Sequence, residues 1–81
     1  MIDVKQAVQA SVRFAESILG PERAQQMLVE EVEYAEDRVS WVITLSLPAG
    51  GLQVFGKEYK TFVVDAETGE VRSMKIRQLA A

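Results

Sequence analysis

The chain has 81 residues, of which 48% are hydrophobic and 26% charged, a composition typical of one folded domain spanning 1–81 with a single modest core. Its formal net charge of -3 gives no general attraction for nucleic acid or for anionic membranes. The lack of Cys and His removes thiolate nucleophiles, cysteine zinc sites and the commonest proton shuttle, so we expect a protein that is not an enzyme and that uses no cofactor or metal.

The first residues predict a cytoplasmic location. Asp3 follows Met1 almost at once, with no basic leader and no continuous apolar stretch. No apolar run in the sequence is long enough to span a bilayer.

The first predicted element is an amphipathic helix that begins after Asp3 and ends at Gly20. Asp3 with Gln6 three residues later has the pattern of an N-cap with a reciprocal partner, and Pro21 follows the stop at Gly20. Its polar face carries too few basic residues for a helix that lies on a membrane, so we expect the apolar face to pack on a sheet. That face contains Val4, Ala7, Val8, Ser11, Val12, Phe14, Ala15, Ile18 and Leu19.

Two strands are predicted next, after a short helical turn within 21–26. Segment 27–35 places Leu28, Val32 and Tyr34 on one face, although its glutamates would also tolerate a helix. A polar turn over 36–38 leads into the clearest strand of the sequence, which ends at Pro48 and should be central. Its apolar residues alternate with small or polar ones and should face the helix: Val39, Trp41, Ile43, Leu45 and Leu47.

Segment 48–56, PAGGLQVFG, contains three apolar residues that a plain solvent loop would not need: Leu52, Val54 and Phe55. They would tuck under the sheet or extend the next strand, or they would form a mobile lip over a small hydrophobic pocket or a surface for a partner. We include these three residues in a predicted partner or ligand surface.

Segment 59–77 predicts a β-hairpin. Lys60, Phe62 and Val64 share one face of its first strand, and the turn is built by the Asp65 carboxylate and by Gly69, which takes a positive φ. In the second strand one face carries Arg72, Met74 and Ile76, and Met74 and Ile76 should face the core. The basic residues of this strand complete the predicted surface: Arg72, Lys75 and Arg77.

The segments WVITLSL (41–47) and VVDAETGEV (63–71) resemble the end of a PepSY-type domain, and a helix over a curved sheet is similar to a cystatin-like roll. The resemblance covers the last half of the chain. It implies a binding or inhibitory module, often associated with peptidases and usually outside the cytoplasm, and it implies no catalytic residue.

Five carboxylates in the first predicted strand and the turn after it resemble a cation site but lack the spacing of an EF-hand, so we expect a solvated acidic edge. They are Glu30, Glu31, Glu33, Glu36 and Asp37.

Together the elements predict an α+β fold, with the N-terminal helix packed on one face of a four-stranded antiparallel meander sheet. The first and last strands would be an acidic and a basic edge, which favours self-association as a homodimer.

Two functions fit this fold. One is a protein-interaction or regulatory module of the inhibitor or immunity type, binding an unknown protein partner. The other is a cystatin-like carrier of a small hydrophobic ligand, which would need an unfilled cavity between helix and sheet. The large side chains available to fill that space are Phe14, Trp41, Phe62 and Met74.

Overall fold

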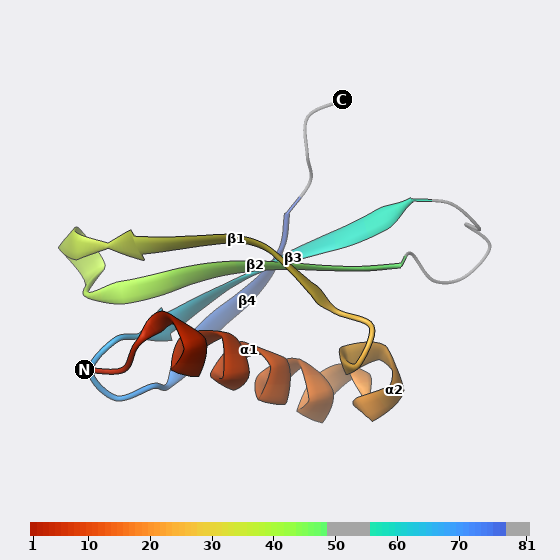
Figure 1. Cartoon of the computed structure of the whole chain (residues 1–81), viewed down its shortest axis with the longest axis horizontal. Coiled ribbons are helices and arrows are strands. Elements are labelled where there is room, and N and C mark those ends of the chain that lie inside the picture. The colour runs from red at the N-terminus through yellow and green to blue at the C-terminus, as the bar shows by residue number, and fades with distance from the viewer. Residues whose placement is uncertain (49–55, 78–81) are drawn as a thin grey trace.

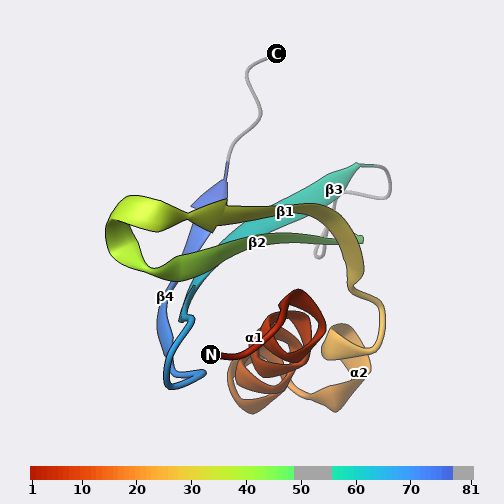
Figure 2. The same cartoon turned by 60° about the vertical axis from the view of Figure 1, so that its left-hand side comes forward.

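The computed structural model describes residues 1–48 and 56–77 and has an α+β architecture (Figure 1). The elements in chain order are α1 (Val4–Leu19), α2 (Pro21–Ala24), β1 (Leu28–Ala35), a 3₁₀ turn (Glu36–Arg38), β2 (Ser40–Pro48), β3 (Lys57–Asp65) and β4 (Val71–Arg77). The strands pair antiparallel in the order β1-β2-β3-β4. Both helices lie on the same side of the curved sheet (Figures 1 and 2). The predicted fold, with an N-terminal helix on a four-stranded antiparallel meander, is therefore confirmed.

Helix α1 begins at the predicted cap. The Asp3 carboxylate accepts a hydrogen bond from the backbone N–H of Gln6 at 2.8 Å, and the Gln6 amide oxygen accepts one from the N–H of Asp3 at 2.9 Å. The face turned to the sheet is a row of small buried residues, Ala7, Ser11 and Ala15, which lets the helix approach closely. Ile18 was predicted on this face but is 53% exposed, because the buried row advances by four residues and continues to Leu19.

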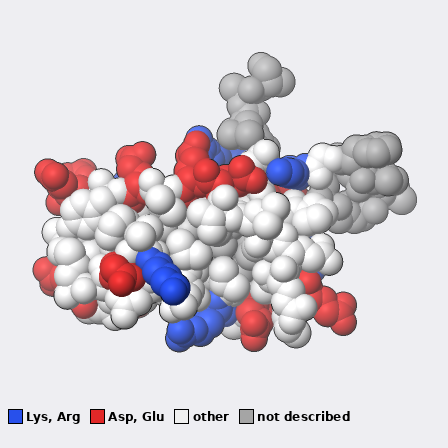
Figure 3. Space-filling model, in the orientation of Figure 1, with Lys and Arg blue, Asp and Glu red and all other residues white. Residues whose placement is uncertain are grey.

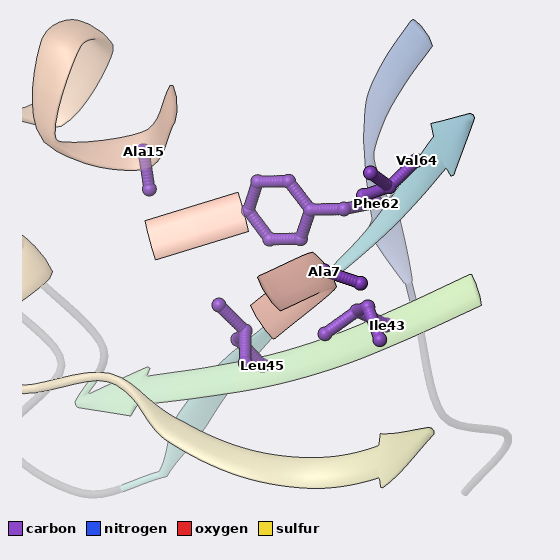
Figure 4. Close-up of a cluster of buried hydrophobic side chains, with 6 residues drawn as sticks. All are labelled: Ala7, Ala15, Ile43, Leu45, Phe62 and Val64. Atoms are coloured by element: carbon purple, nitrogen blue, oxygen red, sulfur yellow. The ribbon is translucent and has the colours of Figure 1, made fainter. Parts of the chain in front are cut away.

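The core lies between α1 and the sheet (Figure 4). Its fully buried apolar side chains are Ala7, Ala15, Ile43, Leu45, Phe62 and Val64. Phe14, Trp41 and Met74 are partly buried and pack against this cluster. The odd-numbered residues of β2 from Trp41 onward thus face the helix, as the alternation predicts. The indole N–H of Trp41 donates to the carbonyl oxygen of Ile2 at 3.1 Å, which ties the strand to the chain just before α1.

Two details of the first strand pair differ from the prediction. Val39 has a left-handed conformation with φ 45°, so β2 begins at Ser40 rather than at Val39. In β1 the register shifts between Val29 and Glu31, which is the signature of a β-bulge. Because of this bulge Leu28 lies opposite Ser46, on the other face from Val32 and Tyr34.

The pairing of β3 with β4 also contains a bulge. Val64 pairs with Val71 while Val63 pairs with Ser73, so Arg72 is the extra residue of a bulge that interrupts the regular alternation between Arg72 and Met74. Met74 lies opposite Phe62 and packs on the core. Ile76 lies on the same side of the sheet as Met74, as predicted, but it is not buried in the core.

Ile76 is 74% exposed. It lies opposite Lys60 on the helix side of the sheet, near the C-terminal end of the edge strand β4. The register therefore carries Ile76 beyond the part of the sheet that the core cluster covers.

The turn between β3 and β4 is built as the sequence predicts. The Asp65 carboxylate accepts hydrogen bonds from the backbone N–H groups of Glu67 at 2.8 Å and Thr68 at 3.1 Å, and Gly69 has φ 80°. The same carboxylate binds the Arg72 guanidinium at 2.5 Å. The Arg72 hydrogen bond, followed by the two backbone hydrogen bonds, lowers the pKa of Asp65 from 3.8 to about 2.

We expect this carboxylate to make stability depend on pH in the acid range. Since the pKa of Asp65 is lower in the folded chain, its contribution is complete above about pH 4 and is lost as the pH falls toward 2. Asp65→Asn should lower the melting temperature at neutral pH, and the difference from the wild type should shrink over that interval. Thermal unfolding followed by circular dichroism measures this difference. Glu67→Gln, in the same turn, is the control, and an Asp65→Asn variant that keeps the wild-type pH dependence would contradict the assignment.

Phe62 and Ile76 both lie on the helix side of the sheet, but only Phe62 is buried in the core. Phe62→Ala should reduce the free energy of unfolding by about 3–5 kcal/mol, because it removes the largest of the fully buried side chains that the structure describes. Ile76→Ala should change it by less than about 0.5 kcal/mol, because Ile76 is exposed. Chemical denaturation measures both values, and a large loss on truncating Ile76 would mean that another surface covers it.

Candidate interaction surface

The sheet face opposite α1, called the open face here, has a floor of short side chains. Strand β2 contributes Ser40, Val42, Thr44 and Ser46, and β3 contributes Thr61 and Val63 beside them. The hydroxyl groups of Thr44 and Thr61 are 3.3 Å apart. These side chains are too short to cover the sheet, so the longer side chains of the edge strands determine its outline.

Charges from the two edges of the sheet meet above this floor. The guanidinium of Arg77 on β4 forms an ion pair with the carboxylate of Glu31 on β1, and it also donates to the hydroxyl of Thr44 at 3.3 Å. The Glu31 hydrogen bond raises the pKa of Arg77 above its ordinary value. A hollow of about 260 Å³ lies here, lined by Glu31, Glu33, Val42, Thr44, Thr61 and Arg77.

The predicted basic surface is only partly assembled. Lys75 and Arg77 share the open face, opposite Thr61 and Tyr59, whereas Arg72 lies in the bulge and binds the carboxylate of Asp65. Two of the three basic residues are thus paired with carboxylates of the same chain. This reduces the attraction that a basic β4 edge would offer to an acidic partner.

The other half of the predicted surface, Leu52, Val54 and Phe55, lies outside the described residues. A second hollow of about 180 Å³ includes Pro48 and Gly56, the described residues on either side of 49–55. It is lined by Gln26, Leu28, Ser46, Leu47, Pro48, Gly56 and Lys57.

The most exposed apolar strand of the described chain is β1, which sequence reasoning did not select. Leu28, Val29 and Val32 are 60%, 52% and 47% exposed. Val29 and Val32 lie opposite Leu45 and Ile43, on the helix side of the sheet, yet α1 packs mainly against β2, β3 and β4. The sequence alone could not reveal that Val29 and Val32 are exposed, because an apolar residue on the helix side of a sheet is normally assigned to the core.

Carboxylates lie along the same strand. Glu30, Glu31 and Glu33 are all exposed, and Figure 3 shows acidic side chains gathered along the border of the molecule where β1 runs. Glu30 occupies the bulge and accepts hydrogen bonds from Ser46 at 2.7 Å and from Lys57 at 3.4 Å, of which the Ser46 bond contributes most to lowering its pKa. We call the unpaired edge of β1, with its exposed apolar residues and these carboxylates, the β1 border.

The predicted solvated acidic edge is therefore exposed, and part of it forms ion pairs. Within residues 1–48 and 56–77, no group of three or more carboxylates is arranged to hold a metal ion. No described helix is long and apolar enough to cross a membrane.

Comparison of the chain with protein-family models, with curated proteins and with solved structures finds no match. The resemblance to PepSY-type and cystatin-like domains therefore stays a prediction.

The ion pair across the open face should be sensitive to salt. Arg77→Gln should lower the melting temperature at low ionic strength, and the loss should largely disappear near 1 M salt, where the Debye length falls to about 3 Å. The control is Arg13→Gln, an exposed change of the same kind on α1. Equal losses for Arg77→Gln at both salt concentrations would show that packing, and not charge, gives Arg77 its role.

Proposed function

We propose that this chain is a protein-interaction or regulatory module that binds another protein through the β1 border. One observation carries the proposal: an edge strand, with one side of its backbone unpaired by the sheet, also exposes Leu28, Val29 and Val32. Exposed edges invite pairing with another chain, and folded proteins usually protect them with polar or charged side chains. Large apolar residues at this position are costly to leave in water, so they support a role in binding.

The proposal also rests on the form of binding that an edge allows. A partner segment that adds to an edge strand gains affinity from main-chain hydrogen bonds and specificity from its alternating side chains. Neither requires a pocket or a catalytic group. This agrees with the binding or inhibitory role that the PepSY-like resemblance implies.

The alternative of a small hydrophobic-ligand carrier has less support. A carrier needs space between helix and sheet, and here that interface contains the fully buried Phe62, Ile43 and Leu45. Phe14, Trp41 and Met74 pack against the same cluster. A ligand would have to displace these side chains, whose packing stabilises the only hydrophobic cluster found among the described residues.

The proposal includes a cytoplasmic, non-enzymatic role that involves neither nucleic acid nor membrane. The net charge of -3 supports the exclusion of nucleic acid, because an acidic chain gains little counterion-release energy from phosphates. A homodimer through the acidic and basic edges, the self-association expected from the sequence, is a competing use of the same border.

Site-specific photo-crosslinking in the cells that make the protein tests this proposal. A photoreactive amino acid placed at Val29 should form an adduct with a second protein, whereas the same amino acid at Ile76, exposed on the opposite edge, should not. The captured protein is then purified, and its affinity for the wild-type chain is measured. Val29→Thr with Val32→Thr should weaken binding roughly tenfold, because two methyl groups of the contact become hydroxyls.

Threonine keeps the β-branched shape, so this double variant should remain folded. Ile76→Thr is the matched control and should bind like the wild type. The proposal fails if no heterologous adduct forms at Val29, if the adduct is a second copy of this chain, or if the double variant binds as tightly as the wild type.

A further inference from the structure

The two faces of β1 differ in chemistry, and any strand added to its edge would meet both. Val29, Val32 and Tyr34 pair with Leu45, Ile43 and Trp41, so they lie on the helix side. Glu31 and Glu33 pair with Thr44 and Val42 on the open face. Residues directly opposite each other on paired strands share a face. An added strand would therefore place alternate residues beside apolar side chains and beside carboxylates.

The charge of this segment selects the partner. Residues 28–37 contain five carboxylates and no Lys or Arg. Lys57 and Arg77 form ion pairs with two of them, Glu30 and Glu31, so Glu33, Glu36 and Asp37 supply the excess negative charge. Pairing β1 with β1 of a second copy would bring two such segments together, and like charges facing each other across strands are destabilising. Charge therefore opposes a symmetric dimer through β1.

Pairing with β4 of a second copy is also disfavoured. Arg72 and Arg77 are already engaged by Asp65 and Glu31 of their own chain, which leaves Lys75 as the one β4 cation without an ion pair to another described residue. Such a contact would also join unlike edges, and it would extend into open filaments unless its rotation closed a ring.

We infer that the β1 border binds an extended, basic segment of another protein, in which apolar residues on the helix side alternate with Lys or Arg on the open face. This inference rests on the proposed function and specifies its partner. The apolar residues of the added strand cover Val29 and Val32, and its cations approach the carboxylate of Glu33 on the open face. The whole contact extends the sheet by one strand.

The same carboxylates explain how an exposed edge avoids indiscriminate pairing. Acidic and neutral strands would leave the glutamates of β1 repelled or poorly solvated, and the bulge at Glu30 disturbs a regular ladder. A basic alternating strand removes the charge penalty. The border thus discriminates by charge while its apolar residues supply affinity.

Heteronuclear NMR with synthetic peptides tests the inference directly on the whole chain. The probe is a capped peptide of 8 residues, the length of β1, with alternating Lys and Val. It should shift the amide signals of Leu28–Ala35 more than those of Val71–Arg77, and its affinity should fall as salt is added. A Glu/Val peptide should not bind, and a Lys/Val peptide interrupted by proline should bind weakly, because proline removes ladder donors.

A charge reversal separates specific recognition from general attraction. Glu33→Lys should weaken binding of the Lys/Val peptide about fivefold, because an exposed attraction becomes a repulsion. Glu22→Lys makes the same change of charge on α2 and should alter affinity less than about twofold. Both residues are exposed, so neither variant should unfold the chain.

The inference is overturned if the Lys/Val peptide does not bind, if the Glu/Val peptide binds equally well, or if Glu22→Lys weakens binding as much as Glu33→Lys. Crosslinking at Val29 gives a separate result. A captured protein that needs Val29 and Val32 but is indifferent to Glu33→Lys would preserve the proposed function and reject the basic partner.

Discussion

The packing of one helix against four strands determines which parts of the sheet are buried and which stay exposed. A helix with its side chains is about 10 Å wide, whereas four strands spaced about 4.8 Å apart present a broader surface. Helix α1 packs mainly on β2, β3 and β4, with the small residues Ala7, Ser11 and Ala15 turned toward the sheet. The core therefore centres on Phe62 and Ile43, and among residues 1–48 and 56–77 nothing covers the helix side of β1 to a comparable extent.

Contacts of the N-terminus with the hairpin turn hold α1 in this position. The backbone N–H of Ile2 donates to the carbonyl oxygen of Ala66 at 2.7 Å, and the carbonyl oxygen of Ile2 accepts from the indole of Trp41. The side chain of Ile2 lies against Gly69. These contacts fix the start of the helix beside β2 and the turn after β3.

As a result, the two edge strands of the sheet differ in their exposed apolar residues and in their charge. On β4 the exposed apolar residue is Ile76, and both arginines are held by carboxylates of the same chain. On β1 three apolar residues are exposed beside a run of glutamates. Arg77 links the two borders by reaching Glu31 across the open face, so part of the charge contrast expected between the edges is balanced within one molecule. What the β1 border still offers is apolar area and excess negative charge, and both features support the proposal that it binds a basic strand.

The sequence by itself determined the features that depend on neighbouring residues. The cap at Asp3, the stop at Gly20, the Asp65 turn and the alternation of β2 all follow from local hydrogen bonding and side-chain period, and all are present in the structure. Tertiary structure alone decided the bulges at Glu30 and Arg72, the exposure of Ile76, and the meeting of Arg77 with Glu31. The candidate border belongs to this second group, because whether Val29 and Val32 are core or surface depends on where a helix of limited width comes to lie.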